Sequence, residues 1–269
     1  MRLQNYLITE GERTRSITED EAMNKLETNH RVAAVSFRDK DKRIYRGLEK
    51  SHGEFAFVQP SQYNRRSANT LNAYTLLLDN LPEWKQYPKR SKSIIATTEY
   101  SRATDYGHGG SVYCVFPENN FKIGVCPSSD IWDSFKFSMG APDMSTFNYS
   151  LLSLIMLAYD TKDMSIEEFK DFDSFLEKLD YVDKYRFEIH DDYLLPGVIE
   201  DLKLHDYFKK GNKTRLIVHL GKLLNPTKNG FELAKVGDSL PPYREVWTDG
   251  DCVLIEKSYF MDKILGKFR

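Results

Sequence analysis

The sequence predicts an α+β protein with an antiparallel or mixed β-sheet and flanking helices, for three reasons. Runs of β-branched and aromatic residues lie in both outer parts of the chain, whereas the segment near 145–210 has helical periodicity. Strands and helices do not alternate as they do in βαβ units. The composition, 41% hydrophobic and 29% charged, excludes disordered and low-complexity proteins. We expect one domain over 1–269 with an acidic, mostly helical insertion at about 145–210.

The elements of the first half follow from short patterns. Thr18 and Glu21 form a capping box, which predicts a short helix after Thr18. A polar stretch at 59–72 predicts a long loop, followed by a helix to about Asn80. β-branched and aromatic runs predict strands, the last two joined as a hairpin, at 32–37, 43–47, 93–97, 111–116 and 121–126.

The second half begins with helices and returns to strands. Apolar spacing predicts helices at 148–159 and 165–181, the second with a capping box at Ser165 and Glu168. Strands are expected at 214–219, 230–236, 244–247 and 252–255.

The charge distribution argues against a protein that binds nucleic acid by passive attraction, because the net charge is -2 and the pI is near 6.3. The segment 160–206 carries 15 acidic and 6 basic residues, and the remainder is basic. The longest apolar stretch, 151–159, is about half of a membrane span, and the first residues contain no apolar signal core. The odd number of cysteines fits a reducing compartment, so we expect a cytoplasmic protein without a membrane partner.

Common catalytic motifs are absent from the sequence. It has no phosphate-binding loop, no dinucleotide-binding G-x-G-x-x-G and no G-x-S-x-G elbow. The segment 190–192, His-Asp-Asp, has no second cluster beside it and is expected to be surface charge, so no metal site is predicted.

Three short segments far apart in the chain are the best candidates for chemistry. The first places Arg46 and Gly47 at the end of an expected strand. The second ends a strand in two hydroxyls, Thr97 and Thr98. The third places Glu245 on a late strand. Taken singly, each is also compatible with ordinary surface or strand-end residues.

In this order and spacing the three segments resemble the mono-ADP-ribosyltransferases of the arginine-serine-glutamate type, especially phage-encoded and bacterial-toxin members. The resemblance implies an ADP-ribosyltransferase-like fold with Arg46 as the strand arginine and Glu245 as the catalytic glutamate. It also implies that 96–98 replaces the Ser-Thr-Ser signature, and that Tyr106 packs on nicotinamide.

Two positions depart from the family pattern. Ala96 stands where the family usually has serine, so Thr97, Thr98 or a water would have to make that hydrogen bond. Tyr243 stands two residues before the glutamate, where arginine-modifying members have a second carboxylate. A phenol can stack or hydrogen-bond but cannot act as a base at neutral pH, so Tyr243 is expected to recognise an acceptor other than arginine.

The residue types suit NAD as a substrate. The Arg46 guanidinium can hold pyrophosphate oxygens bidentately, and the Glu245 carboxylate can stabilise the positive charge that develops on the ribose. Gly47 can expose backbone groups to nicotinamide, and Thr97 and Thr98 can orient the carboxylate or the ribose. The implied acceptor is a macromolecule in the host cytoplasm, with protein favoured over RNA or DNA. The resemblance to toxins also leaves room for an antitoxin or immunity partner.

Two alternatives remain at this level. The chain could be a non-catalytic phage or mobile-element protein that contacts nucleic-acid phosphates through its basic residues, Arg46, Arg65, Arg66, Lys89 and Arg90. It could also be a degenerate transferase kept as an interaction module, because Ala96 replaces the family's serine.

Overall fold

The computed structural model describes residues 14–62, 64–65, 72–135, 143–159, 169, 171–189 and 195–268. Within them the chain forms two compact units. The first comprises the described residues of 1–65, 87–130 and 231–269, and the second comprises those of 66–86 and 131–230. The expected acidic segment at 145–210 falls inside the second unit, and the reading of the chain as one domain with an insertion stays a prediction.

The first unit is built on one sheet, antiparallel at every described pairing, in the order β1-β3-β9-β5-β2-β4-β8-β6-β7. The α+β class is therefore confirmed. The strands are β1 (Thr14–Ser16), β2 (Tyr45–Leu48), β3 (Phe55–Val58), β4 (Ile94–Thr97), β5 (Ser111–Pro117), β6 (Lys122–Val125), β7 (Glu232–Lys235), β8 (Glu245–Thr248) and β9 (Cys252–Glu256).

The pairing between β2 and β4 is much shorter than the pairings on either side of it. These strands are joined by one residue pair, Tyr45 with Thr97, whereas β2 pairs with β5 and β4 pairs with β8 over four residues each. The junction therefore separates a part made of β1, β3, β9, β5 and β2 from a part made of β4, β8, β6 and β7.

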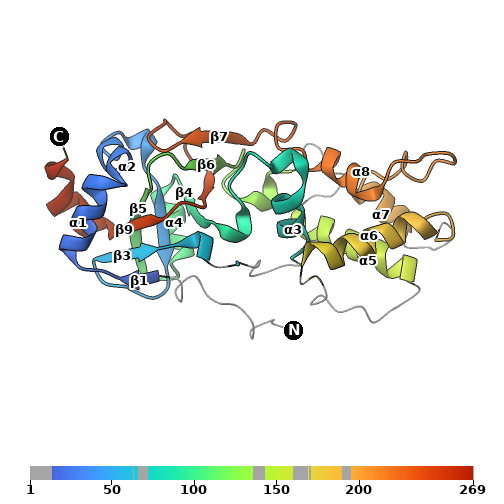
Figure 1. Ribbon diagram of the computed structural model, residues 1–269, viewed down its shortest axis with the longest axis horizontal. Helices are drawn as coiled ribbons and strands as arrows, with labels where there is room; N and C mark the ends of the chain where they lie inside the picture. Colours follow the sequence, from blue (N-terminus) through green and yellow to red (C-terminus); the bar gives the residue numbers. More distant parts are fainter. Residues whose placement is uncertain are drawn as a thin grey trace. The chain divides into compact units, whose positions relative to one another are not determined.

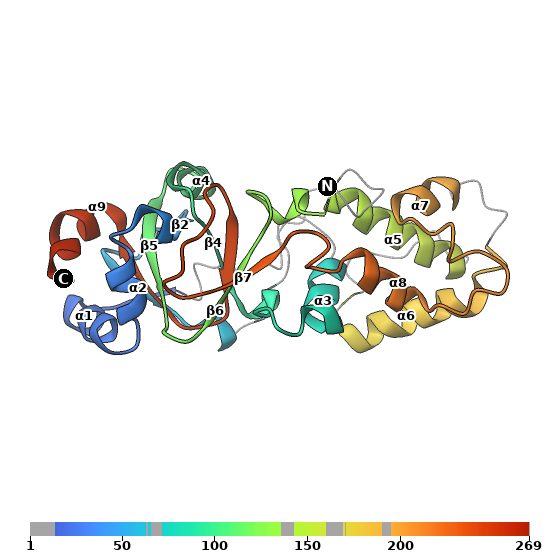
Figure 2. The ribbon, with the colours of Figure 1, turned by 90° about the horizontal axis from the view of Figure 1, so that it is seen from above.

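Helices cover the sheet of the first unit. α1 (Glu19–Thr28), α2 (Arg31–Ser36) and α9 (Lys257–Tyr259) lie on the same side of β5 (Figures 1 and 2). They contribute to an apolar core together with buried residues of the strands. α4 (Tyr100–Tyr106) connects β4 to β5 and packs on β2 next to the junction.

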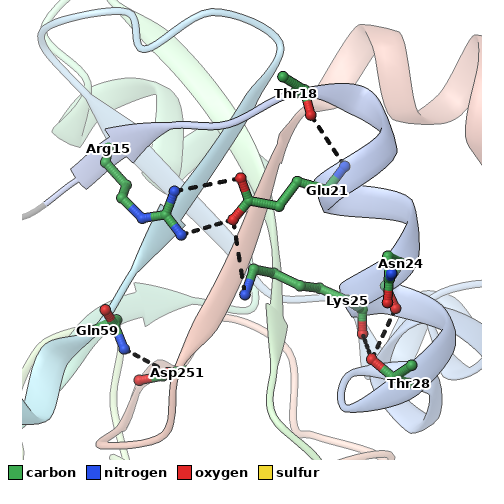
Figure 3. Close-up of polar contacts among 8 residues, drawn as sticks. All are labelled: Arg15, Thr18, Glu21, Asn24, Lys25, Thr28, Gln59 and Asp251. Carbon is green, nitrogen blue, oxygen red and sulfur yellow. Dashed lines mark hydrogen bonds and ion pairs between the residues drawn. The ribbon is translucent and has the colours of Figure 1, made fainter.

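Ion pairs join strand β1 to helix α1. Arg15 on β1 donates to Glu21, and Lys25 lies on the same carboxylate (Figure 3). Both cations lie over the ring of Phe57 on β3, at 5.1 and 4.0 Å from its centroid. Thr18 caps α1 by accepting from the backbone N–H of Glu21, which confirms the expected helix start.

The second unit is helical. Its helices are α3 (Ala73–Asn80), α5 (Met144–Tyr159), α6 (Phe172–Tyr185), α7 (Leu195–Asp201) and α8 (Leu216–Leu223). α5 packs against α6 and α7, and α8 packs against α6. Asp171 caps α6 by accepting from the N–H of Ser174, and the capping box expected at Ser165 lies outside the described residues.

Three sequence-based expectations were wrong. Segment 32–37 is mostly helix α2, because its buried residues, Ala33, Ala34 and Phe37, repeat at helical spacing. Segment 214–219 leads into helix α8, whose buried residues include Leu216, Leu220 and Leu223. Strands β5 and β6 form no hairpin, because β5 pairs with β2 and β9, and β6 pairs with β8 and β7.

Candidate active site

The three segments singled out by sequence come together at the junction of β2 and β4. Thr97 pairs with Tyr45 on one side and with Glu245 on the other, so these residues are direct neighbours across three strands. The ladder between β2 and β4 stops there. The Arg46 side chain bridges the two strands instead, because its Nη1 donates to the backbone carbonyl of Ile95 at 2.5 Å.

The charge of Glu245 acts on both Arg46 and Tyr106. Burial and the nearby Arg65 lower the pKa of Arg46 to about 9, against the opposing effects of Glu245 and Tyr106. Burial raises the pKa of Tyr106 to about 12, and the charges of Asp130 and Glu245 add to this effect. The Arg46 guanidinium is therefore poorly solvated, and the Tyr106 phenol is neutral at neutral pH.

Arg46 also lines a recess of the first unit. The recess has about 310 Å³ of space not filled by atoms, a figure that includes open solvent. Its walls are mostly apolar, and they are formed by Thr14, Arg46, Leu48, Val58, Pro60, Ser93, Ile94 and Leu254. Glu245 is not part of this lining, and only 5% of its surface is exposed. In this conformation the carboxylate is therefore largely covered.

Ala96, which departs from the family pattern, faces the apolar core. It is 4% exposed, pairs with Val246 and belongs to the same core as Ile94. The hydroxyl beside Glu245 in the sheet is that of Thr97, which accepts a hydrogen bond from the N–H of Glu99 at 3.1 Å. A small apolar residue at 96 thus has a packing reason.

Thr98 fastens the loop that precedes Glu245. Its hydroxyl donates to the carbonyl of Pro241 and accepts from the N–H of Arg244, both at 3.0 Å, and its own N–H donates to the carbonyl of Arg244. Tyr243 lies between these anchors with φ +57° and 60% of its surface exposed. Because β8 begins at Glu245, Tyr243 lies outside the strand.

Gly47 allows a helix to approach the sheet closely. A Cβ at this position would lie 1.9 Å from the carbonyl oxygen of Ala103, in the middle of α4, and 2.5 Å from the nitrogen of Gly107, which caps the C-terminus of α4. Close packing of α4 is therefore a sufficient reason for this glycine. Its expected contact with nicotinamide stays a prediction.

Sequence reasoning missed the partner of Glu245. Arg90 is buried, and its Nη2 lies 2.6 Å from Oε1 of Glu245. Its guanidinium also lies over the ring of Trp247, 5.3 Å from the centroid. Trp247 follows Glu245 by two residues on β8, so strand alternation could have placed the two side chains on one face. The contribution of Arg90 depends on tertiary structure that no local pattern encodes.

Comparisons of the chain with protein-family models, with curated proteins and with solved structures find no match. Within the described ranges, no helix has both the length and the apolar character needed to cross a bilayer. The same ranges contain no group of three or more His, Cys, Asp or Glu side chains that could hold a metal ion. The segment 190–192 and Arg66 lie outside them.

Proposed function

We propose that the chain is an NAD-dependent mono-ADP-ribosyltransferase that cleaves the bond between nicotinamide and ribose and transfers ADP-ribose to a macromolecule. The observation that carries the proposal is the convergence of Arg46, Tyr106 and Glu245 on one strand junction, although the sequence places them far apart. The proposed fold is that of the arginine-serine-glutamate transferases named above.

The residues fit the chemical groups of NAD. Arg46 is a cation with little solvation, so anionic oxygens of a pyrophosphate would compensate for its burial and for the repulsion from Arg65. Tyr106 is neutral and offers an aromatic face to nicotinamide. Glu245 carries the negative charge that stabilises a positively charged ribose as the bond to nicotinamide breaks. The acceptor then forms the new bond to the ribose carbon and loses its proton.

The loop around Tyr243 supports a role in choosing the acceptor. A bulky residue in the left-handed region costs about 1–3 kcal/mol, and such strain is concentrated at functional sites. Thr98 fixes the loop on both sides of Tyr243. The ring of Tyr243 is exposed, and the residue precedes Glu245 by two positions in the sequence. Because a phenol is no base at neutral pH, we propose a non-arginine acceptor, with protein favoured over nucleic acid by the net charge of -2.

The experiment is to incubate the purified protein with labelled NAD and a cell extract, and then to treat the products separately with protease and with nucleases. We expect label in protease-sensitive material and little label on agmatine, a free arginine analogue. Labelling of agmatine at the rate seen for the extract contradicts the argument from Tyr243. Absence of both labelling and nicotinamide release contradicts the proposed function.

The nucleic-acid alternative loses one of its expected contacts. Arg90 is 4% exposed and paired with Glu245, so it is not available to a phosphate backbone. Binding through several phosphate contacts weakens steeply with salt, whereas binding at an NAD site depends far less on salt. A salt titration of DNA and RNA binding therefore separates the two functions.

A further inference from the structure

The Glu245 carboxylate lies in a buried cluster that its proposed chemistry does not by itself explain. Arg90 and Glu245 form an ion pair at 2.6 Å, and their side chains are only 4% and 7% exposed. Removing one partner from a buried pair leaves an uncompensated charge, which is strongly unfavourable. The state of Glu245 therefore depends on Arg90.

Arg90 is itself held by a rigid support. The indole of Trp247 lies beneath its guanidinium and donates from Nε1 to the carbonyl of Pro88 at 2.9 Å. Tyr87 stacks on the same indole with ring centroids 6.2 Å apart. Segment 87–90 is thus docked on β8, and Arg90 reaches Glu245 from a fixed position.

The contacts to the carboxylate are made to one of its two oxygens. Arg90 lies on Oε1, and the buried thiol of Cys126 points to the same atom with Sγ at 3.7 Å. Both of these contacts are made to Oε1, and neither is made to Oε2. The cluster therefore fixes the rotation of the carboxylate and leaves Oε2 for a ligand.

We propose that Arg90 is a positioning residue for the transferase reaction. It holds Oε1 of Glu245 so that Oε2 grips a ribose hydroxyl of NAD. The inference rests on the proposed function. Arg90 acts through Glu245, so its loss lowers turnover, whereas the affinity for NAD depends on Arg46 and Tyr106 and changes little.

The test is steady-state nicotinamide release by Arg90→Gln, Arg90→Lys, Glu245→Gln and the double variant Arg90→Gln/Glu245→Gln. We expect Arg90→Gln to lower kcat about 10-fold to 100-fold, with KM for NAD within about threefold of the wild type. Arg90→Lys keeps the charge and is expected to recover part of the loss. In the Glu245→Gln background the Arg90→Gln substitution should lower kcat no further, because the two residues act together.

The matched control is Arg186→Gln. Arg186 is also buried, at 8% exposed, and lies over an aromatic ring, that of Tyr207, but it belongs to the helical unit. The Arg186→Gln substitution should lower the unfolding temperature and leave kcat unchanged.

Several results overturn the inference. One is a folded Arg90→Gln protein with unchanged kcat, and another is an equal loss in the wild-type and Glu245→Gln backgrounds. Should Arg90→Gln fail to fold, Arg90→Lys replaces it. A loss of at least about threefold that vanishes in the Glu245→Gln background then supports the inference, and any other result contradicts it. A wild-type protein that releases no nicotinamide contradicts the proposed function itself.

Discussion

Replacing Gly124 with alanine should disturb the support of the site from a distance. Gly124 on β6 pairs with Trp247 on β8, and the indole lies directly over the glycine. A Cβ at position 124 would lie 2.3 Å from both Cε2 and Cζ2 of Trp247. Carbon atoms in good contact are about 3.5–4.0 Å apart, so the buried ring must move by more than about 1 Å.

The magnitude follows from two opposing effects. Glycine inside a strand is less favourable than alanine by about 0.5–1 kcal/mol, which favours the variant. Overpacking a tight core costs about 1–3 kcal/mol, and here the ring is 1% exposed and bonded to Pro88. We expect overpacking to dominate, with an unfolding temperature lowered by a few degrees. Because the moved indole carries Arg90, nicotinamide release should fall as well.

The assay is thermal unfolding followed by circular dichroism and tryptophan fluorescence, together with nicotinamide release below the transition. Gly266→Ala is the control, because its Cβ would meet no atom within 4 Å and its unit is the same. An unchanged unfolding temperature and unchanged turnover in Gly124→Ala would refute the close packing of Trp247 on β6.

Three further predictions concern affinity, the core and pH. Arg46→Lys keeps a charge but loses the planar fork, so calorimetry should find weaker NAD binding with an intact fold, and equal affinity would remove Arg46 from the cofactor site. Ala96→Ser places a hydroxyl in the apolar core and should cost about 1–3 kcal/mol in urea unfolding without raising nicotinamide release; a gain in release would show that the family's serine belongs at this position. Burial lowers the pKa of His30, whose Nδ1 lies 2.9 Å from the carbonyl of Phe116, so the unfolded chain takes up a proton more readily. Stability should therefore be full above about pH 6.5 and decline as the pH falls below it, more in the wild type than in His30→Asn, and equal urea midpoints from about pH 7.5 to about pH 5 would contradict this.

The sequence allowed the strands that carry the site to be located closely, because each is a compact run of β-branched or aromatic residues. The expected segments 43–47, 93–97 and 244–247 became β2, β4 and β8 with small shifts of their ends. Segments 32–37 and 214–219 have similar composition but form helices. In short runs the composition does not decide between strand and helix. The spacing of the residues that face the core does.

The arrangement of the site depended on contacts between distant parts of the chain. Nothing near Arg90 in the sequence distinguishes it from the exposed Lys89, and only the fold brings it onto Glu245 and Trp247. The single pair that joins β2 to β4 is likewise a property of the whole sheet. Local patterns indicated which residues form the site, whereas the contacts of those residues with distant parts of the chain could not be predicted.

The central claim is that Glu245 stabilises charge that develops only as the bond to nicotinamide breaks, and the most direct measurement is turnover of Glu245→Gln beside its affinity for NAD. We expect turnover to fall about 100-fold to 1,000-fold while calorimetry finds NAD affinity nearly unchanged. Asp183→Asn, which replaces a partly buried carboxylate in the helical unit, is the control and should retain full turnover. Equal nicotinamide release by Glu245→Gln and the wild type would contradict the account.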